Sequence, residues 1–274
     1  MSSALAAASV VLTLAAGGLR AQEDTLGEVL ADHGCVVGPS EVMADDGLPR
    51  ELRDELMAYA ETALDTGQAK QQGEWIVLGP ELCTIRPPEI DSAYDITAPV
   101  VARSISAVDA YAEFEEYGCF VASEEMQQDL MEQDGLTRDA AAVVYLEVLA
   151  EGVRSGQVSF FSDDPLRTPM GFQVLTGECA DVPRIDDIRR SQALMLEHFD
   201  TLVRDNASRV TCEANGAPVT VEVGQTLTDL TNGEVVNAWT MMDMLMLAID
   251  AGWVEGISAT ERGTPRPPIC SYDE

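Results

Sequence analysis

Apolar residues recur at helical spacing just ahead of alternate cysteines. Leu26, Val29, Leu30 and His33 fall at i, i+3, i+4 and i+7, so they share one face of a helix that precedes Cys35. The same spacing predicts helices before Cys119 and Cys212, on Val108, Tyr111 and Phe114 and on Met195, Phe199, Leu202 and Val203.

A second helix is expected after each of three Asp-Gly or Asn-Gly turns. In the first, Pro49 suits the opening helical position and Gly67 the C-cap. In the next, Thr137 is the expected N-cap and Gly156 follows the last turn. The third helix is predicted over residues 234–251.

Short extended segments follow these helices. Residues 75–78 and 172–175 are rich in aromatic and β-branched types, and residues 219–223 alternate valine with polar residues, so all three are predicted strands. Helix dominates the whole pattern. The predicted fold class is therefore α+β and helix-rich.

Two stretches of the chain match each other in four places, in the same order. We interpret these matches as an internal repeat of the form helix–Cys–helix–strand–Cys, with a more divergent third copy. The predicted units are residues 22–90, 100–183 and 186–274. The matches pair His33-Gly34-Cys35-Val36-Val37 with Tyr117-Gly118-Cys119-Phe120-Val121, Asp46-Gly47-Leu48 with Asp134-Gly135-Leu136, Thr66-Gly67-Gln68 with Ser155-Gly156-Gln157, and Val77-Leu78 with Val174-Leu175.

The six cysteines favour disulfides, because their number is even and no Cys-x-x-Cys pair is present. If each repeat unit contains one disulfide, each bridge would stabilise the folded state by about 4 kcal/mol in the chain-entropy model. The alternative pairing joins neighbours across units, Cys83 with Cys119 and Cys179 with Cys212. The preferred pairing is Cys35–Cys83, Cys119–Cys179 and Cys212–Cys270.

Residues 1–21 are typical of a signal peptide, since an uncharged apolar run over residues 4–18 is followed by Leu19-Arg20-Ala21 and then by a polar stretch. An uncleaved anchor and a buried N-terminal helix are the alternatives. No later segment is a predicted membrane span, because the best one, residues 239–249, is too short and contains Asp243. We therefore expect a periplasmic or secreted protein.

Charge restricts the partners. The chain has 16 Lys and Arg against 48 Asp and Glu, a formal net charge of −32, and loss of residues 1–21 with Arg20 makes it −33. Such a charge disfavours nucleic acid and anionic lipid as partners. It favours a protein with a basic face, although it is also compatible with selection for solubility alone.

No catalytic motif is present, and we expect no cofactor. The chain lacks Gly-x-Ser-x-Gly, a P-loop and His-Glu-x-x-His, and it has only two histidines and one lysine. His33 is interpreted as a packing residue. If the protein is an enzyme, His198 with Glu197 or Asp200 is the candidate general base.

A methionine run on the third predicted long helix allows a metal hypothesis. Thioethers bind Cu(I), but the run covers both sides of the helix, which favours adaptable core packing. The run consists of Met241, Met242, Met244 and Met246.

These patterns favour a non-catalytic binding or structural protein of the cell envelope that acts through protein–protein contacts. One alternative is an extracytoplasmic hydrolase with a site assembled from distant residues. The other is periplasmic copper binding through the methionine run.

Overall fold

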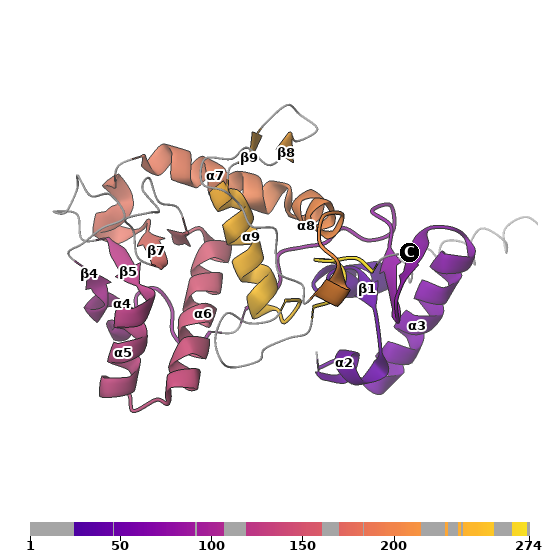
Figure 1. Cartoon of the computed structure of the whole chain (residues 1–274), viewed down its shortest axis with the longest axis horizontal. Coiled ribbons are helices and arrows are strands. Elements are labelled where there is room, and N and C mark those ends of the chain that lie inside the picture. Colours follow the sequence, from indigo (N-terminus) through magenta and orange to yellow (C-terminus); the bar gives the residue numbers. More distant parts are fainter. Residues whose placement is uncertain are drawn as a thin grey trace, which may run out of the picture. The chain divides into compact units, whose positions relative to one another are not determined.

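The computed structural model describes residues 25–45, 47–90, 92–106, 119–160, 170–182, 184–214, 228–229, 235–236, 238–254 and 265–272. The chain divides into an N-terminal unit, Met1–Arg86, and a C-terminal unit, Pro87–Glu274 (Figure 1). Residues of the second and third predicted repeats thus lie in one unit. The proposed signal peptide and the predicted structures at residues 107–118 and 219–223 lie outside the described residues.

The N-terminal unit packs helices against a small antiparallel sheet. Its helical residues 25–31 lead to Cys35, and the strand order of the sheet is β1-β3-β2. The elements are β1 (Val36–Val37), α2 (Ser40–Asp45), α3 (Arg50–Asp65), β2 (Ala69–Gln72) and β3 (Trp75–Leu78).

Helix α3 agrees with the sequence prediction. It begins after Pro49, and its last turn closes with Gly67 at φ +75° and a 2.8 Å hydrogen bond from Gln68 N to Ala63 O. Glycine suits this left-handed position because it has no Cβ. The turn reverses the chain into β2, and buried Leu56 and Ala60 anchor the helix in the core.

The C-terminal unit contains a four-stranded sheet and several helices. Its sheet has the order β4-β5-β7-β6, with antiparallel neighbours. Its helices are α4 (Pro99–Arg103), α5 (Ser123–Gln133), α6 (Arg138–Ser155), α7 (Ile185–Glu197), α8 (Phe199–Ala207) and α9 (Ala238–Asp250). Its other elements are β4 (Ile105–Ser106), β5 (Phe120–Ala122), β6 (Val158–Ser159), β7 (Gly171–Val174), β8 (Thr228–Asp229), β9 (Val235–Val236) and the 3₁₀ turns η1 (Gly177–Asp181) and η2 (Cys212–Ala214).

The two sheets share a strand order. The order β1-β3-β2 in the first sheet corresponds to β5-β7-β6 in the second. In each sheet the last strand, β3 or β7, lies in the middle of this set. On one side it pairs with the strand that follows a cysteine, β1 or β5, and on the other with the strand that follows the long helix, β2 or β6. The hydrogen bond from Leu78 N to Cys35 O measures 2.9 Å, and that from Val174 N to Cys119 O measures 2.8 Å. Similar local sequence thus accompanies similar local structure.

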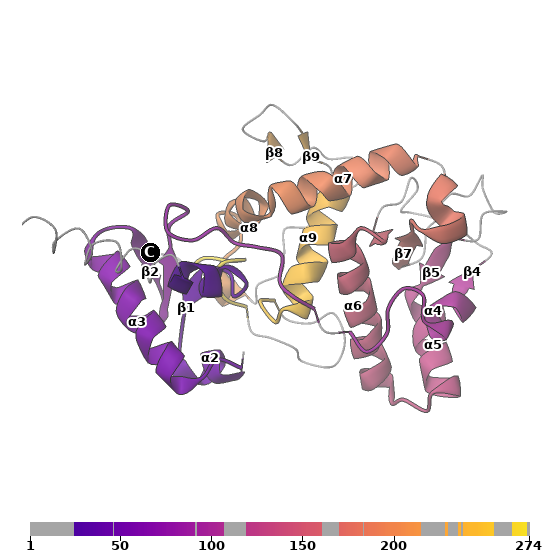
Figure 2. The same ribbon diagram turned by 180° about the vertical axis from the view of Figure 1, so that it is seen from behind.

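Helices α5, α6 and α9 lie side by side, and α7 crosses near the ends of α6 and α9 (Figures 1 and 2). Helix α9 contacts α6, α7 and α8, so residues of the second and third predicted units build a common core. Met244 and Leu247 of α9 are fully buried. This explains why α6 and α9 are apolar over most of their surfaces.

The structure corrects three local predictions. The third long helix starts at Ala238 rather than near residue 234, because Val235–Val236 pairs with Thr228–Asp229 as a strand. The apolar stripe ahead of Cys212, from Met195 to Val203, belongs to two helices, α7 and α8, which meet at His198. Helices α2 and α5 occupy stretches for which no helix was predicted.

The long helices of the described residues fall short of a membrane span in length or in apolar character.

Candidate functional site

Three disulfides tie the chain together, with the pairing that the repeat predicted. They join Cys35 to Cys83, Cys119 to Cys179 and Cys212 to Cys270, with Cα–Cα distances of 5.6, 5.7 and 5.1 Å. All six half-cystines are buried.

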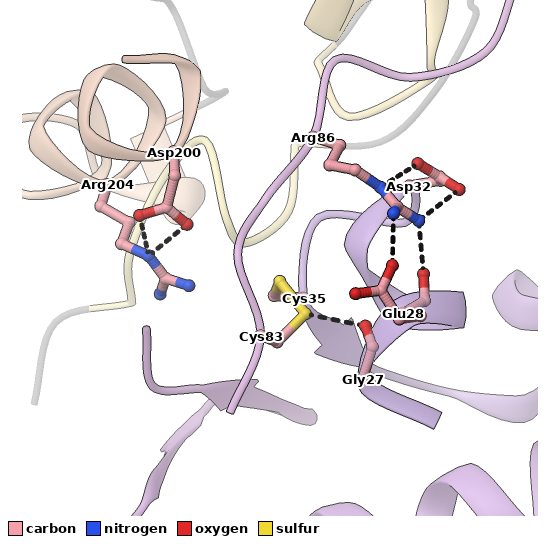
Figure 3. Close-up of a disulfide and its surroundings, with 8 residues drawn as sticks. All are labelled: Gly27, Glu28, Asp32, Cys35, Cys83, Arg86, Asp200 and Arg204. Atoms are coloured by element: carbon pink, nitrogen blue, oxygen red, sulfur yellow. Dashed lines mark hydrogen bonds and ion pairs between the residues drawn. A yellow bond between two sulfur atoms is a disulfide. The ribbon is translucent and has the colours of Figure 1, made fainter. Parts of the chain in front are cut away.

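The first disulfide lies beside an ion-pair cluster (Figure 3). Arg86 Nε donates to Asp32 Oδ1 at 2.9 Å, and the same guanidinium pairs with Glu28 and donates to its carbonyl oxygen at 2.7 Å. The hydrogen bond with Asp32 is the main factor that raises the pKa of Arg86. Arg86 therefore fastens the segment that follows Cys83 to the helical segment that precedes Cys35, and we assign it a structural role.

A cleft of about 410 Å³ lies in the C-terminal unit and is called here the α5–α6 cleft. Helices α5 and α6, the residue after β6, the residue before β7 and helix α9 all contribute to it. Its inner wall is apolar and buried, which is the usual character of a binding site. The wall residues are Ala142, Tyr145, Leu146, Leu149, Phe160 and Met246, and the rim residues are Ser123, Gln127, Arg138, Asp139 and Met170.

The cleft continues into a shallower outer hollow of about 840 Å³. Ser123, Gln127, Arg138 and Met170 line both. The hollow adds polar residues of α5, including the exposed Glu124 and Glu125. Residues lining the hollow alone are Ala122, Glu124, Glu125, Gln128 and Met131.

Met170 is unusual among the described residues, because other large hydrophobic side chains there are buried or half-buried, whereas 57% of its surface is exposed. Its position follows from β7, since Ser123 N donates to Met170 O at 2.8 Å and ties the start of that strand to the start of α5. The two walls of the cleft are thus held together at its mouth.

Hydrogen bonds order the polar side of the cleft. Gln127 Nε2 donates to Ser123 Oγ at 2.7 Å, and the side chain of Ser123 also bonds to Tyr145. Burial raises the pKa of Tyr145 well above its usual range. The phenol is therefore neutral and acts as a fixed polar point within an apolar wall.

Asp243 lies behind the inner wall and is fully buried. Phe160 N donates to its Oδ1 at 2.8 Å, and Ser159 Oγ donates to its Oδ2 at 2.9 Å. Burial raises the pKa of Asp243 to about 7, although these two hydrogen bonds oppose the shift. Asp243 positions the backbone of Phe160, whose ring lines the cleft.

His198 lies at the junction of α7 and α8. Its Nε2 is buried and has no hydrogen-bond partner in the part of the chain that the structure describes. Arg204 Nε engages Asp200 instead, at 3.0 and 3.1 Å from the two carboxylate oxygens. The structure therefore does not bring His198 and Asp200 together as an acid–base pair.

The methionine run packs in the core. Met241, Met244 and Met246 are buried and Met242 is half-buried. Met246 lines the α5–α6 cleft, whereas Met241 and Met244 are buried and do not line it, so the four sulfurs do not converge on one open site. Among the described residues, no cluster of three or more His, Cys, Asp or Glu is arranged to hold a metal ion.

The cleft residues were not predicted from the sequence, because they come from segments far apart in the chain. One local signal was available: Asp243 is the single acid within the apolar run of residues 239–249. A carboxylate in such a helix must find buried donors, and this one does.

Searches of protein-family models, of curated proteins and of solved structures find no match for this chain.

Proposed function

We propose that the chain is an exported, acidic, non-catalytic binding protein of the cell envelope, which acts through protein–protein contacts at the α5–α6 cleft. The observation that carries this proposal is the exposed side chain of Met170 at the mouth of a cleft with an apolar inner wall. Burial of such a surface by a partner is favourable at about 25 cal/mol per Å² of apolar area removed from water.

A protein segment suits this site better than a compact small molecule. The cleft and the larger outer hollow share four lining residues, and the hollow is lined by further residues of α5, so an occupant of the apolar part can continue along α5. Protein interfaces combine an apolar anchor with a polar rim in this way.

Export is supported by two independent features. Three disulfides require an oxidising compartment to persist, such as the periplasm or the cell exterior. Residues 1–21 have the pattern of a cleaved signal. The intact mass of the protein recovered from its native compartment tests this, because cleavage predicts a chain that begins at Gln22.

We also propose that the chain consists of three related units. The shared strand order supports the first two. The third resembles them at the end of its long helix, where Trp253 N bonds to Ala248 O at 2.9 Å, as Gln68 N bonds to Ala63 O and Gln157 N to Gly152 O at 2.8 Å each. Gly252 there has φ +73°, close to the values at the other two helix ends.

The decisive experiment is a crosslinked pull-down from the native cell envelope with the tagged mature protein. We expect a stoichiometric partner that is captured by the wild type and by Met170→Leu, and lost with Met170→Asp and at high salt. Thermal unfolding of each variant checks that the fold persists. Equal capture by the Met170→Asp variant would place the partner elsewhere on the surface, and no partner above an unrelated acidic control would overturn the proposal.

A further inference from the structure

We propose that the occupant of the α5–α6 cleft is a basic segment of a partner protein that carries one large apolar side chain between Lys or Arg residues. The apolar side chain enters the inner wall, and the basic residues face Glu124 and Glu125. This inference rests on the function proposed above and specifies the chemistry of the partner.

The apolar half of the argument concerns the inner wall. Leu146, Leu149 and Met246 are buried side chains that nevertheless line the cleft, so an inserted group would contact them directly. Phe160 is held in place because its backbone N–H is bonded to Asp243. A preformed apolar wall lowers the entropic cost of binding, since little has to be ordered when the partner arrives.

The charged half of the argument concerns helix α5. The helix contains four acidic residues and no basic one. Arg103 neutralises Asp129 at 2.8 Å, but Glu124 and Glu125 have no ion-pair partner within the described ranges. Both are in the first turn, where a negative charge also stabilises the helix. Their side chains are exposed and line the outer hollow, so they are available to a cationic segment.

Arg138 makes the rim asymmetric. It lines both the cleft and the hollow, it is exposed, and no ion pair engages it in the part of the molecule that is described. A cationic segment is repelled there and attracted at Glu124 and Glu125. The net charge of the chain adds to the attraction over longer distances, which raises the association rate.

The chain offers matched controls for this charge pattern. Arg50 and Glu51 begin α3 in the N-terminal unit, at the positions that correspond to Arg138 and Asp139 in the proposed repeat. Arg50 and Glu51 are exposed, and Glu51 lies in the first turn of its helix, as Glu124 and Glu125 do. Substitutions there change the net charge and the helix start without touching the cleft.

The test uses the full mature chain and a fluorescein-labelled synthetic peptide with one central Phe flanked on each side by two Lys and then Gly and Ser. Two further peptides replace Phe by Ala or every Lys by Glu. Fluorescence anisotropy measures the dissociation constants at low salt and at 0.15 M salt, where the Debye length is about 8 Å. We expect the Lys–Phe peptide to bind and the two control peptides not to bind. The affinity of the Lys–Phe peptide should fall as the salt concentration rises.

The variants test where and how the peptide binds. Glu124→Lys with Glu125→Lys should weaken binding about tenfold more than Glu51→Lys with Glu55→Lys does, because both pairs change the net charge equally and Glu51 and Glu55 are exposed on α3. Arg138→Glu should strengthen binding about threefold relative to Arg50→Glu. The pair Glu124→Gln with Glu125→Gln repeats the first test with less cost to the helix start. Met170→Ser should weaken binding as well, because it removes apolar contact at the mouth without adding a charge.

The outcomes separate this inference from the proposed function. No binding of the Lys–Phe peptide by the wild type, or equal effects of the cleft and control substitutions, would overturn the inference. A Met170-dependent partner in the pull-down would then still support the proposed function. A dimer that Met170→Asp dissociates in sedimentation would also overturn the inference, because a second copy of this acidic chain would then be the occupant.

Discussion

Ser159 Oγ donates a 2.9 Å hydrogen bond to Asp243 Oδ2, and this bond joins the end of β6 to the middle of α9 across 84 residues of sequence. The backbone of Phe160 supplies the second donor to the same carboxylate. Asp243 is fully buried, and in the described structure no cation compensates its charge. The two hydrogen bonds therefore fasten the cleft wall at Phe160 to α9, and their strength depends on the protonation of the Asp243 carboxyl group.

This arrangement predicts a specific dependence of stability on pH. Burial raises the pKa of Asp243 from 3.8 to about 7 in the folded state, so between these values folding takes up a proton. Stability from this group is fully present below about pH 4 and falls as the pH rises to 7, by at most about 4 kcal/mol. Asp243→Asn removes this component.

Urea unfolding between pH 4 and 8 measures the free energy of unfolding, and hydrogen exchange of the α9 amides over the same pH range shows whether the change is located at α9. The control is Asp54→Asn on the exposed face of α3, which changes the net charge equally. The wild type and the control should lose stability more steeply with rising pH than Asp243→Asn does. Parallel curves for all three proteins would show that Asp243 keeps an ordinary pKa.

Gly171 allows β7 to approach β5 closely, and its replacement by Ala should destabilise the C-terminal unit. A Cβ atom there would lie 2.2 Å from Val121 O, a backbone atom that cannot move without breaking the pairing. We expect a loss of about 1–3 kcal/mol in thermal unfolding. At Gly79 the same substitution meets only the flexible end of Glu81, so Gly79→Ala should cost much less. Equal costs would contradict the close-approach argument.

The methionine run should respond as core packing does. Met244→Ala removes a fully buried side chain and should cost about 2–5 kcal/mol, whereas Met242→Ala, at a half-buried position, should cost less. Replacement of all four methionines by Leu should leave Cu(I) retention unchanged in competition with a chromogenic chelator. A clear loss of bound copper in that variant would instead support a metal site.

Loss of the first disulfide should destabilise the N-terminal unit by about 4 kcal/mol in the chain-entropy model. The bridge closes a loop with a sequence separation of 48 between Cys35 and Cys83. We expect the Cys35→Ser/Cys83→Ser protein to lose hydrogen-exchange protection in α3 and β3 first. Unchanged protection there would mean that the Arg86 cluster and the apolar core suffice without the bridge.

Local sequence determined much of the secondary structure, because caps and periodicity act over a few residues. Thr137 was expected as an N-cap, and its hydroxyl accepts a bond from Ala140 N at 3.3 Å. Gly67 and Gly156 were expected at helix ends, and both adopt φ +75°. The cysteine spacing and the matches around Gly34 and Gly118 favoured the disulfide pairing that the structure shows, over an alternative that joined neighbouring units.

Strand pairing and helix packing explain where the local helical patterns misled. Residues 235–236 have helical neighbours in sequence, but pairing with Thr228–Asp229 makes them a strand. The stripe from Met195 to Val203 reads as continuous, yet the chain turns at His198 so that α8 can also pack against α9. Helical periodicity registers neither the pairing of β8 with β9 nor the packing of α8 against α9, because it describes one helix face at a time.

The sequence by itself determined the helix-rich composition of the fold and the acidic character of the chain, since each depends on residue types and short spacings, and it favoured the cysteine pairing through the internal matches. Only the tertiary structure decided that α9 packs against both α6 and α7, that Asp243 meets Ser159, and that Met170 lies at the mouth of an apolar cleft. These are contacts between residues far apart in the chain. They depend on how whole helices pack, which the pattern within any one helix does not specify.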